Sequence, residues 1–393
     1  MPDVDISKSN ALKFVVLIGV VSFFADITYE GARSITGPYL ALLGANAVVV
    51  GFVSGFGEWV GYGLRILSGY IADRSQKYWL ITITGYICNL LVVPLLALAN
   101  QWWLAATLII IERLGKAIRV PARDAMLSHA GEVMGMGWGF GLHEALDRAG
   151  AMLGPLVVAC VLYFKQSYQS SFAFLLIPAL LAIVTLFFSR WLYPHPQALV
   201  LKEKTWHPEP LKQKIFWLYV TAAAFVAAGF ADFPLMAFHF GKTKTFAPVW
   251  IPVVYSMSMA ATLITAPLFG KWYDKKGMGI LVYITLFSSF FAPCVFLGGS
   301  LFAVVGMILW GVGMASHEAL MRAIVANLVA PNKRGSAYGI FNMVYGTAWF
   351  IGSVVMGLLY DKSILSLVIF SLLIQLSAVP LLYHVMNKLN QSR

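Results

Sequence analysis

Residues 112–124 read Glu-Arg-Leu-Gly-Lys-Ala-Ile-Arg-Val-Pro-Ala-Arg-Asp, and they close an apolar run that begins near Trp102. The run resembles a membrane span, yet its second half carries four basic and two acidic residues. Four of these charged residues follow one another at steps of four, three and four: Glu112, Lys116, Arg119 and Arg123. This spacing predicts one charged stripe along a helix. An ionisable group at the bilayer centre costs ~3 kcal/mol on insertion scales, so the deeper members should face a partner or a polar pathway. For Arg119 and Arg123, anchoring at the cytoplasmic surface is an equally good interpretation.

The composition is that of a helical membrane protein. Of the 393 residues, 60% are hydrophobic and 11% are charged, whereas soluble domains carry about 25% charged residues. The net charge of +11 lies mainly between the apolar runs, where membrane topology explains it, so no nucleic-acid partner is expected. The three cysteines lie inside apolar runs without C-x-x-C spacing, which predicts neither a disulfide nor a zinc site. We expect no cofactor and no cleaved signal peptide.

Apolar runs long enough to cross a hydrocarbon core of ~30 Å predict twelve spans. The expected spans lie near residues 12–41, 46–72, 78–98, 102–128, 136–164, 170–193, 214–241, 247–273, 278–298, 301–328, 335–360 and 363–388. A polar stretch divides them into bundles of six within residues 1–193 and 214–393, joined by a central loop at 194–213. Basic residues concentrate on the side of this loop, which predicts a cytoplasmic (inner) membrane protein with both termini in the cytoplasm.

The two halves repeat short motifs in the same order. Phe24-Ala25-Asp26 in span 1 is echoed by Phe230-Ala231-Asp232 in span 7, and residues 69–74 and 137–141 are echoed by 270–275 and 335–339. An internal repeat of this kind is typical of secondary transporters built from two related bundles. The sequence therefore predicts an all-α fold of two pseudo-symmetric six-helix bundles around a central cavity.

Several motifs resemble those of the major facilitator superfamily. Gly69-x-x-Ala72-Asp73-Arg74-x-x-Lys77 is similar to the signature that this superfamily carries between spans 2 and 3, with Gln76 in place of the usual glycine. Arg113-x-Gly115-Lys116-x-x-Arg119 resembles a prokaryotic permease subgroup. The resemblance implies a twelve-helix alternating-access transporter and no enzymatic activity. Gly150-x-x-x-Gly154-Pro155 is similar to a span-5 motif of drug/proton antiporters, which favours export, although Val157 and Val158 replace the glycines that usually follow.

Charged residues within the expected spans are the candidate site residues. Buried carboxylates near histidines can load and release protons, and the candidates for this role are Asp26, Glu30 and Glu58. Buried cations suit a carboxylate or phosphate group of the cargo, and the candidates for substrate binding are Arg33, Glu112, Arg113, Lys116, His143, Asp147, Asp232, His317 and Glu318. Charges at the cytoplasmic helix ends can lock a gate, and the candidates are Gly69, Asp73, Arg74, Arg119, Arg123 and Asp124. The numbers of acids and bases nearly balance, so structural ion pairs explain many of them equally well.

These observations predict a proton-coupled, monomeric carrier of a small organic solute with an anionic or zwitterionic head. A proton antiporter of lipophilic cationic drugs is the alternative, followed by a carrier of divalent metals or metal chelates. Residues 143–146 and 317–320 begin like the zinc-protease signature H-E-x-x-H, but both lack the second histidine, which argues against a metalloenzyme. A non-transporting membrane receptor is the alternative from a different class.

Overall fold

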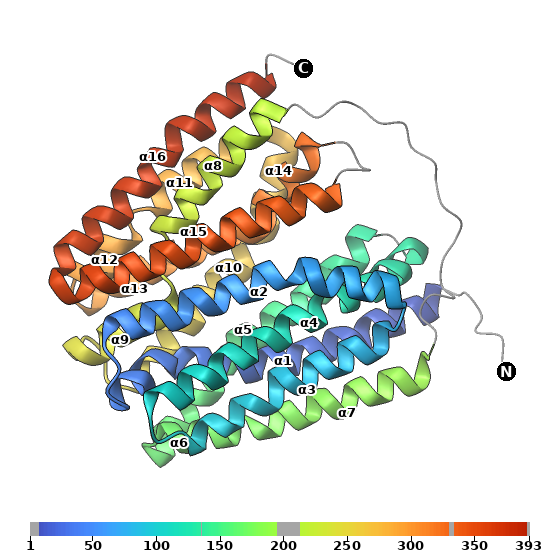
Figure 1. Cartoon of the computed structure of the whole chain (residues 1–393), viewed down its shortest axis with the longest axis horizontal. Coiled ribbons are helices and arrows are strands. Elements are labelled where there is room, and N and C mark those ends of the chain that lie inside the picture. Colours follow the sequence, from blue (N-terminus) through green and yellow to red (C-terminus); the bar gives the residue numbers. More distant parts are fainter. Residues whose placement is uncertain (1–7, 135, 195–212, 330–333, 391–393) are drawn as a thin grey trace. The chain divides into compact units, whose positions relative to one another are not determined.

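The computed structural model describes residues 8–134, 136–194, 213–329 and 334–390, and their regular structure is entirely helical (Figure 1). The helices of the first half are α1 (Lys8–Leu42), α2 (Ala47–Ser75), α3 (Tyr78–Leu95), α4 (Trp102–Met134), α5 (Met136–Lys165), α6 (Tyr168–Phe174) and α7 (Leu176–Leu192). Those of the second half are α8 (Gln213–Gly229), α9 (Phe233–Thr243), α10 (Trp250–Lys276), α11 (Gly279–Ser288), α12 (Phe291–Leu297), α13 (Ser300–Ala315), α14 (Met321–Leu328), α15 (Arg334–Lys362) and α16 (Ile364–Asn390). The all-α prediction is confirmed.

Ten helical segments of the described chain are long and apolar enough to cross a membrane. The two other expected spans are also helical, and each departs from the simple pattern for a visible reason. The helix α4 has 33 residues, ample for a crossing, but carries the charged stripe of residues 112–124. The helix α13 has only 16 residues and continues through a π-helical turn, Ser316–Leu320, into α14. Short π-helical turns inside longer helices often accompany functional sites.

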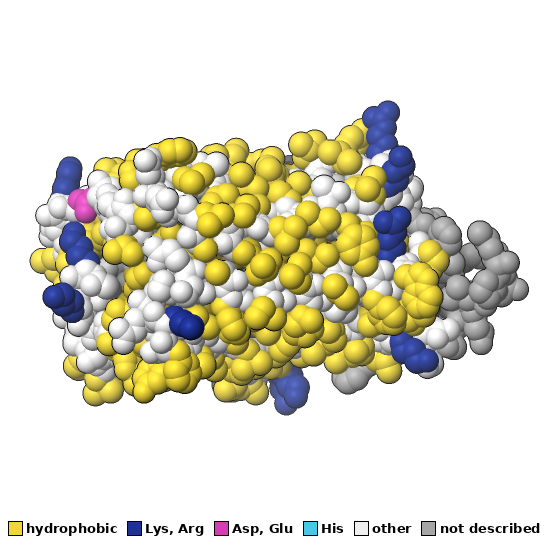
Figure 2. Space-filling view, turned by 90° about the horizontal axis from the view of Figure 1, so that it is seen from below, with side chains coloured by type: hydrophobic (Ala, Val, Ile, Leu, Met, Phe, Trp, Pro, Cys, Tyr) yellow, Lys and Arg dark blue, Asp and Glu magenta, His cyan; other side chains and the backbone are white. Residues whose placement is uncertain are grey.

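Large apolar side chains cover much of the surface. Figure 2 shows hydrophobic side chains over the middle of one face, with most of the visible Lys and Arg toward its two ends. On α7, Trp191 is 76% exposed and Val184 is 65% exposed. Exposed apolar area of this extent is suited to contact with lipid.

The chain forms two compact units, one of Met1–Ser34 with Gly63–Thr205 and one of Ile35–Tyr62 with Trp206–Arg393. Residues 35–62 comprise the end of α1, the start of α2 and the connection between them. This segment thus packs with helices of the second half. The Trp59 indole donates a hydrogen bond of 3.2 Å to Thr347 Oγ1 on α15. On the same two helices, the rings of Phe52 and Phe350 lie 5.6 Å apart. The bundle boundaries expected from the sequence stay a prediction.

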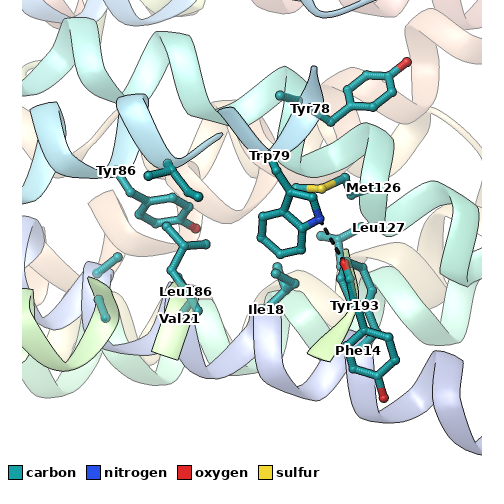
Figure 3. Close-up of a cluster of buried hydrophobic side chains, with 14 of the residues drawn as sticks. Phe14, Ile18, Val21, Tyr78, Trp79, Tyr86, Met126, Leu127, Leu186 and Tyr193 are labelled. Carbon is teal, nitrogen blue, oxygen red and sulfur yellow. Dashed lines mark hydrogen bonds between the residues drawn. The ribbon is translucent and has the colours of Figure 1, made fainter. Parts of the chain in front are cut away.

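The first unit has a hydrophobic core between α1, α3, α4 and α7 (Figure 3). Phe14 of α1 packs edge-on against Trp79 of α3, with ring centroids 6.3 Å apart. The Trp79 indole also donates a hydrogen bond of 2.9 Å to the carbonyl of Tyr193, which follows α7. A buried indole N–H needs such a partner. This core includes side chains of α4, the helix that carries the charged stripe.

In the second unit, span 7 is interrupted between α8 and α9. The helix α8 packs against both α15 and α16. Carbonyl groups freed by the interruption receive hydrogen bonds from neighbouring helices: Gly229 O from Ser371 Oγ at 2.6 Å and from Gln375 Nε2 at 2.9 Å. The Trp310 indole donates to Ala231 O at 2.9 Å. Broken helices persist in a membrane only where the freed backbone groups are satisfied in this way.

Candidate functional site

Asp26 lies within the long helix α1 and is only 2% exposed. Its Oδ1 atom is buried and accepts no hydrogen bond from the residues that the structure describes. Asp147 of α5, Lys116 of α4 and Glu30 of α1 all interact electrostatically with this carboxylate. Asp147 also has a buried oxygen, Oδ1, without a hydrogen-bond donor in the described chain. Two carboxylates with unsatisfied oxygens therefore lie together beside a lysine, inside the first unit.

Two tyrosine rings contact two cations of the charged stripe, Lys116 and Arg119. Lys116 Nζ stands 4.1 Å from the centroid of the Tyr29 ring, and the Arg119 guanidinium stands 4.3 Å from that of the Tyr86 ring. Arg119 is 1% exposed. Its Nε and Nη1 atoms are buried and find no acceptor within the described residues. Cations stacked on aromatic rings gain on the order of 1–2 kcal/mol when desolvated, but stacking leaves the N–H edge of Arg119 unsatisfied.

Ser22 connects four helices in the same region. Its buried hydroxyl lies 2.8 Å from His143 Nε2 of α5 and 3.3 Å from the Tyr86 hydroxyl of α3. Arg123 Nη1 of α4 donates to the same oxygen at 3.4 Å. Arg123 also forms an ion pair of 2.8 Å with its neighbour Asp124. The structure thus joins the expected binding residue His143 to two of the expected gating residues.

Three of the candidate carboxylates form ion pairs with bases close to them in sequence. Besides Asp124–Arg123, Glu112 lies 3.2 Å from Arg113, and Glu30 lies 3.7 Å from Arg33. Asn89 of α3 donates a 2.7 Å hydrogen bond to Glu112 Oε1. These contacts fit the structural interpretation of the balanced charges. Glu144 and Arg148, four residues apart on α5, form a further ion pair of 2.8 Å.

The remaining candidates for proton coupling or substrate binding lie elsewhere. Glu58 is half-buried on α2, in the part of that helix that belongs to the second unit. Asp232 caps α9 by accepting a 2.9 Å hydrogen bond from the backbone N–H of Phe233. His317 is buried with Nδ1 3.0 Å from the Tyr345 hydroxyl and its ring 4.4 Å from that of Phe230. The side chain of Glu318 lies outside the described residues.

The expected gating residues at the end of α2 form no ion pair with those of α4 in the described chain. Asp73 and Arg74 are exposed, and in the described chain neither forms an ion pair with Arg123 or Asp124. Arg74 instead donates to the Tyr70 hydroxyl at 3.1 Å. A Cβ atom added to Gly69 would lie 3.5 Å from Pro121 Cβ, an ordinary contact. In this conformation, the space around position 69 would accommodate a Cβ atom, so glycine is not required there.

Four residues of this region were not predicted from the sequence: Ser22, Tyr29, Tyr86 and Asn89. Tyr29 carries a usable signal, because it follows Asp26 by three residues and so shares its helix face. The others are ordinary polar residues in apolar helices, and their role depends on contacts between helices. In the described chain, no group of three or more His, Cys, Asp or Glu residues is arranged to hold a metal ion.

Comparison with known proteins identifies the family of this chain. Residues 15–383 match the model of the Major Facilitator Superfamily. The uncharacterized protein Rv2265 of Mycobacterium tuberculosis is 40% identical over 380 residues, which cover 95% of this chain and 93% of that protein. The multidrug resistance protein MdtH of Photorhabdus laumondii is 25% identical over 333 residues, 82% of this chain and 80% of its own length.

A solved structure shares the fold. The crystal structure of the nucleoside transporter NupG aligns with a TM-score of 0.72 at 17% identity, covering 95% of this chain and 98% of that one. Together with the family match and the membrane-length helices, this establishes the architecture. The chain belongs to the Major Facilitator Superfamily and is a multi-pass membrane transporter rather than an enzyme.

Proposed function

We propose that this transporter couples the movement of a small organic anion or zwitterion to protons, and that Asp26 carries the proton. The observation that supports this most is the buried Asp26 carboxylate, whose Oδ1 has no hydrogen bond in the described chain and which interacts with Asp147 and Lys116. An ionised carboxylate is costly to bury when one of its oxygens has no hydrogen bond. Gain or loss of one proton therefore changes the energy of the whole cluster, which is what coupling requires.

The basic residues of α4 favour a negatively charged cargo. Lys116 and Arg119 lie on the same helix face, close to Asp26, and both are held by tyrosine rings. Arginine binds carboxylates and phosphates through paired N–H groups, and the gain is larger where water is excluded. An anionic or zwitterionic head would meet these cations, whereas a cationic drug would be repelled by them.

A second candidate function is proton-coupled export of lipophilic cations. The 25% identity with a protein named for multidrug resistance favours it. In that case Asp26 and Asp147 would bind the drug's positive charge in exchange for a proton. Lys116, which acts on Asp26 from α4, weighs against this arrangement.

The sequence also supports a membrane location and a transport mechanism for the protein. The distribution of basic residues supports a location in the cytoplasmic membrane with both termini in the cytoplasm. The internal repeat suggests a monomer in which bundles of residues 1–193 and 214–393 rock about a central site.

A stability screen tests the proposal. Purified protein in detergent would be melted with monocarboxylates, zwitterionic amino acids, phosphorylated sugars, divalent metals and tetraphenylphosphonium, at mildly acidic and mildly alkaline pH. A ligand at 100 times its dissociation constant adds about 2.7 kcal/mol to the free energy of unfolding, which a melting curve detects. We expect carboxylates to stabilise the protein more at acidic pH, and we expect Asp26→Asn to remove this pH dependence. Stabilisation by tetraphenylphosphonium alone, or an unchanged pH dependence in Asp26→Asn, would contradict the proposal.

A further inference from the structure

Besides its ion pairs, the first unit holds a small cluster of charges around Asp26. Each of the pairs Glu30–Arg33, Glu112–Arg113 and Asp124–Arg123 is neutral. Four further charged residues, two acids and two bases, interact around Asp26: Asp26, Asp147, Lys116 and Arg119. With both acids ionised, this four-residue cluster is neutral. One additional negative charge leaves it with a net charge of −1 in a site that water reaches poorly.

Arg119 is the member of this cluster that is built to receive an added anion. Its guanidinium is fixed against Tyr86 at 4.3 Å and lies 5.7 Å from the Tyr29 ring centroid. The Nε and Nη1 atoms remain without an acceptor in the described chain. Arg33 and Arg113, the arginines that the sequence suggested for this role, instead have carboxylates beside them at 3.7 and 3.2 Å. Buried N–H groups without an acceptor are costly, and a carboxylate ligand that accepts from Nε and Nη1 would remove that cost.

From these contacts, and on the basis of the proposed function, we infer that Arg119 binds the carboxylate of a monovalent organic anion and that the anion binds together with one proton on the Asp26–Asp147 pair. The proton restores neutrality when the anion arrives. The charged or titratable groups that act on Asp26 are Asp147 from α5, Lys116 and Arg119 from α4, and Tyr29 and Glu30 from α1. The inward proton gradient of a cytoplasmic membrane drives such a pair inward, so this assignment favours uptake rather than the export suggested by residues 150–155.

The test is the dissociation constant of benzoate and lactate over a range of pH, measured by calorimetry on the full-length protein. If one proton binds with each anion, the dissociation constant falls about tenfold for each unit of pH decrease while the acid pair is ionised. We expect Arg119→Gln to weaken binding by about 100-fold, equivalent to the loss of charged hydrogen bonds. Arg119→Lys should retain part of the affinity, because it keeps the charge without the paired N–H geometry.

Controls separate this inference from a general effect of charge or folding. The double variant Glu144→Gln/Arg148→Gln removes an ion pair of α5 outside the cluster and should leave both affinity and pH dependence unchanged. Melting curves verify that each variant is folded. Equal affinity in the wild type and Arg119→Gln would overturn the role of Arg119, and an affinity independent of pH would overturn binding of the proton with the anion. If neither carboxylate binds, the inference fails, and binding of tetraphenylphosphonium with proton release would show that the proposed function fails with it.

Discussion

The two copies of one tripeptide have different structural roles in the two halves of the molecule. Phe24-Ala25-Asp26 lies inside the continuous helix α1, whereas Phe230-Ala231-Asp232 spans the interruption between α8 and α9. Asp26 leaves an oxygen without a hydrogen bond in the described chain, whereas Asp232 caps α9. Both side chains are buried to the same extent, at 2% exposure.

One packing contact is shared by both copies. A glycine of span 5 or span 11 lies against a backbone carbonyl just before the tripeptide: Gly150 against Phe23 O, one residue before it, and Gly352 against Ala228 O, two residues before it. In both halves this close approach leaves no room for a Cβ atom. The difference between the copies therefore does not arise from how the neighbouring helix approaches.

The difference arises from the residues that surround each copy. Pro234 follows Asp232 at the second position of α9, where its missing N–H is not needed, and this favours a helix start at Phe233. Trp310 and Gln375 then satisfy carbonyl groups of the break. Around Asp26 the neighbours are instead charged, namely Asp147 and Lys116. The comparison teaches that the repeat conserves packing, while ionisable chemistry is concentrated in the first half.

The largest expected effect on stability comes from substitutions of the two glycines in the shared contact. Gly150→Ala and Gly352→Ala should each lower the free energy of unfolding by about 2 kcal/mol, because the added Cβ would overlap backbone atoms of α1 or α8. In Gly150→Ala the new atom would also lie 3.0 Å from Asp26 Cβ. This variant should therefore alter the pH dependence of ligand binding, and Gly352→Ala should not.

Denaturant melts in detergent measure the first effect, and ligand affinity at two pH values measures the second. Gly270→Ala is the matched control, since nothing lies within 4 Å of a Cβ at that position. If Gly150→Ala and Gly352→Ala were as stable as this control, the close helix approach in both halves would be wrong.

A smaller effect on stability should distinguish the role of Asp232 from that of Asp26. Asp232→Ala should lower the free energy of unfolding by about 1 kcal/mol through loss of the α9 cap, and Asp232→Asn should be nearly neutral, since asparagine is an equally good cap. Asp26→Ala should not be destabilising in this way, because Asp26 lies inside α1 and caps no helix, and its buried Oδ1 has no hydrogen bond in the described chain. Thermal melts of the three single variants at one pH provide the comparison. Equal losses in Asp26→Ala and Asp232→Ala would mean that Asp26 is a structural residue like its counterpart.

Much of the fold followed from the sequence alone. Composition and run lengths predicted a helical membrane protein, and the motif at residues 69–77 indicated its superfamily. The stripe on α4 was also visible, since the spacing of Lys116 and Arg119 needs only helix geometry. Local pairs such as Glu144 with Arg148 were predictable for the same reason.

What the sequence could not provide was the choice of partner across helices. The sequence suggested Arg113 for substrate binding and Arg119 for gating, but the fold places Glu112 beside the first and Tyr86 against the second. Asp232 looked like a second binding carboxylate because the cap depends on the exact start of α9. Packing between helices that are distant in sequence decides these cases, and hydrophobic periodicity carries no information about it.

The most direct test of the account is the number of protons taken up when a stabilising carboxylate binds. Calorimetry in two buffers with different ionisation enthalpies measures this number for the wild type, Asp26→Asn and Asp232→Asn. The account predicts about one proton for the wild type and for Asp232→Asn, and none for Asp26→Asn. Equal proton uptake in Asp26→Asn and the wild type would contradict the claim that Asp26 carries the coupled proton.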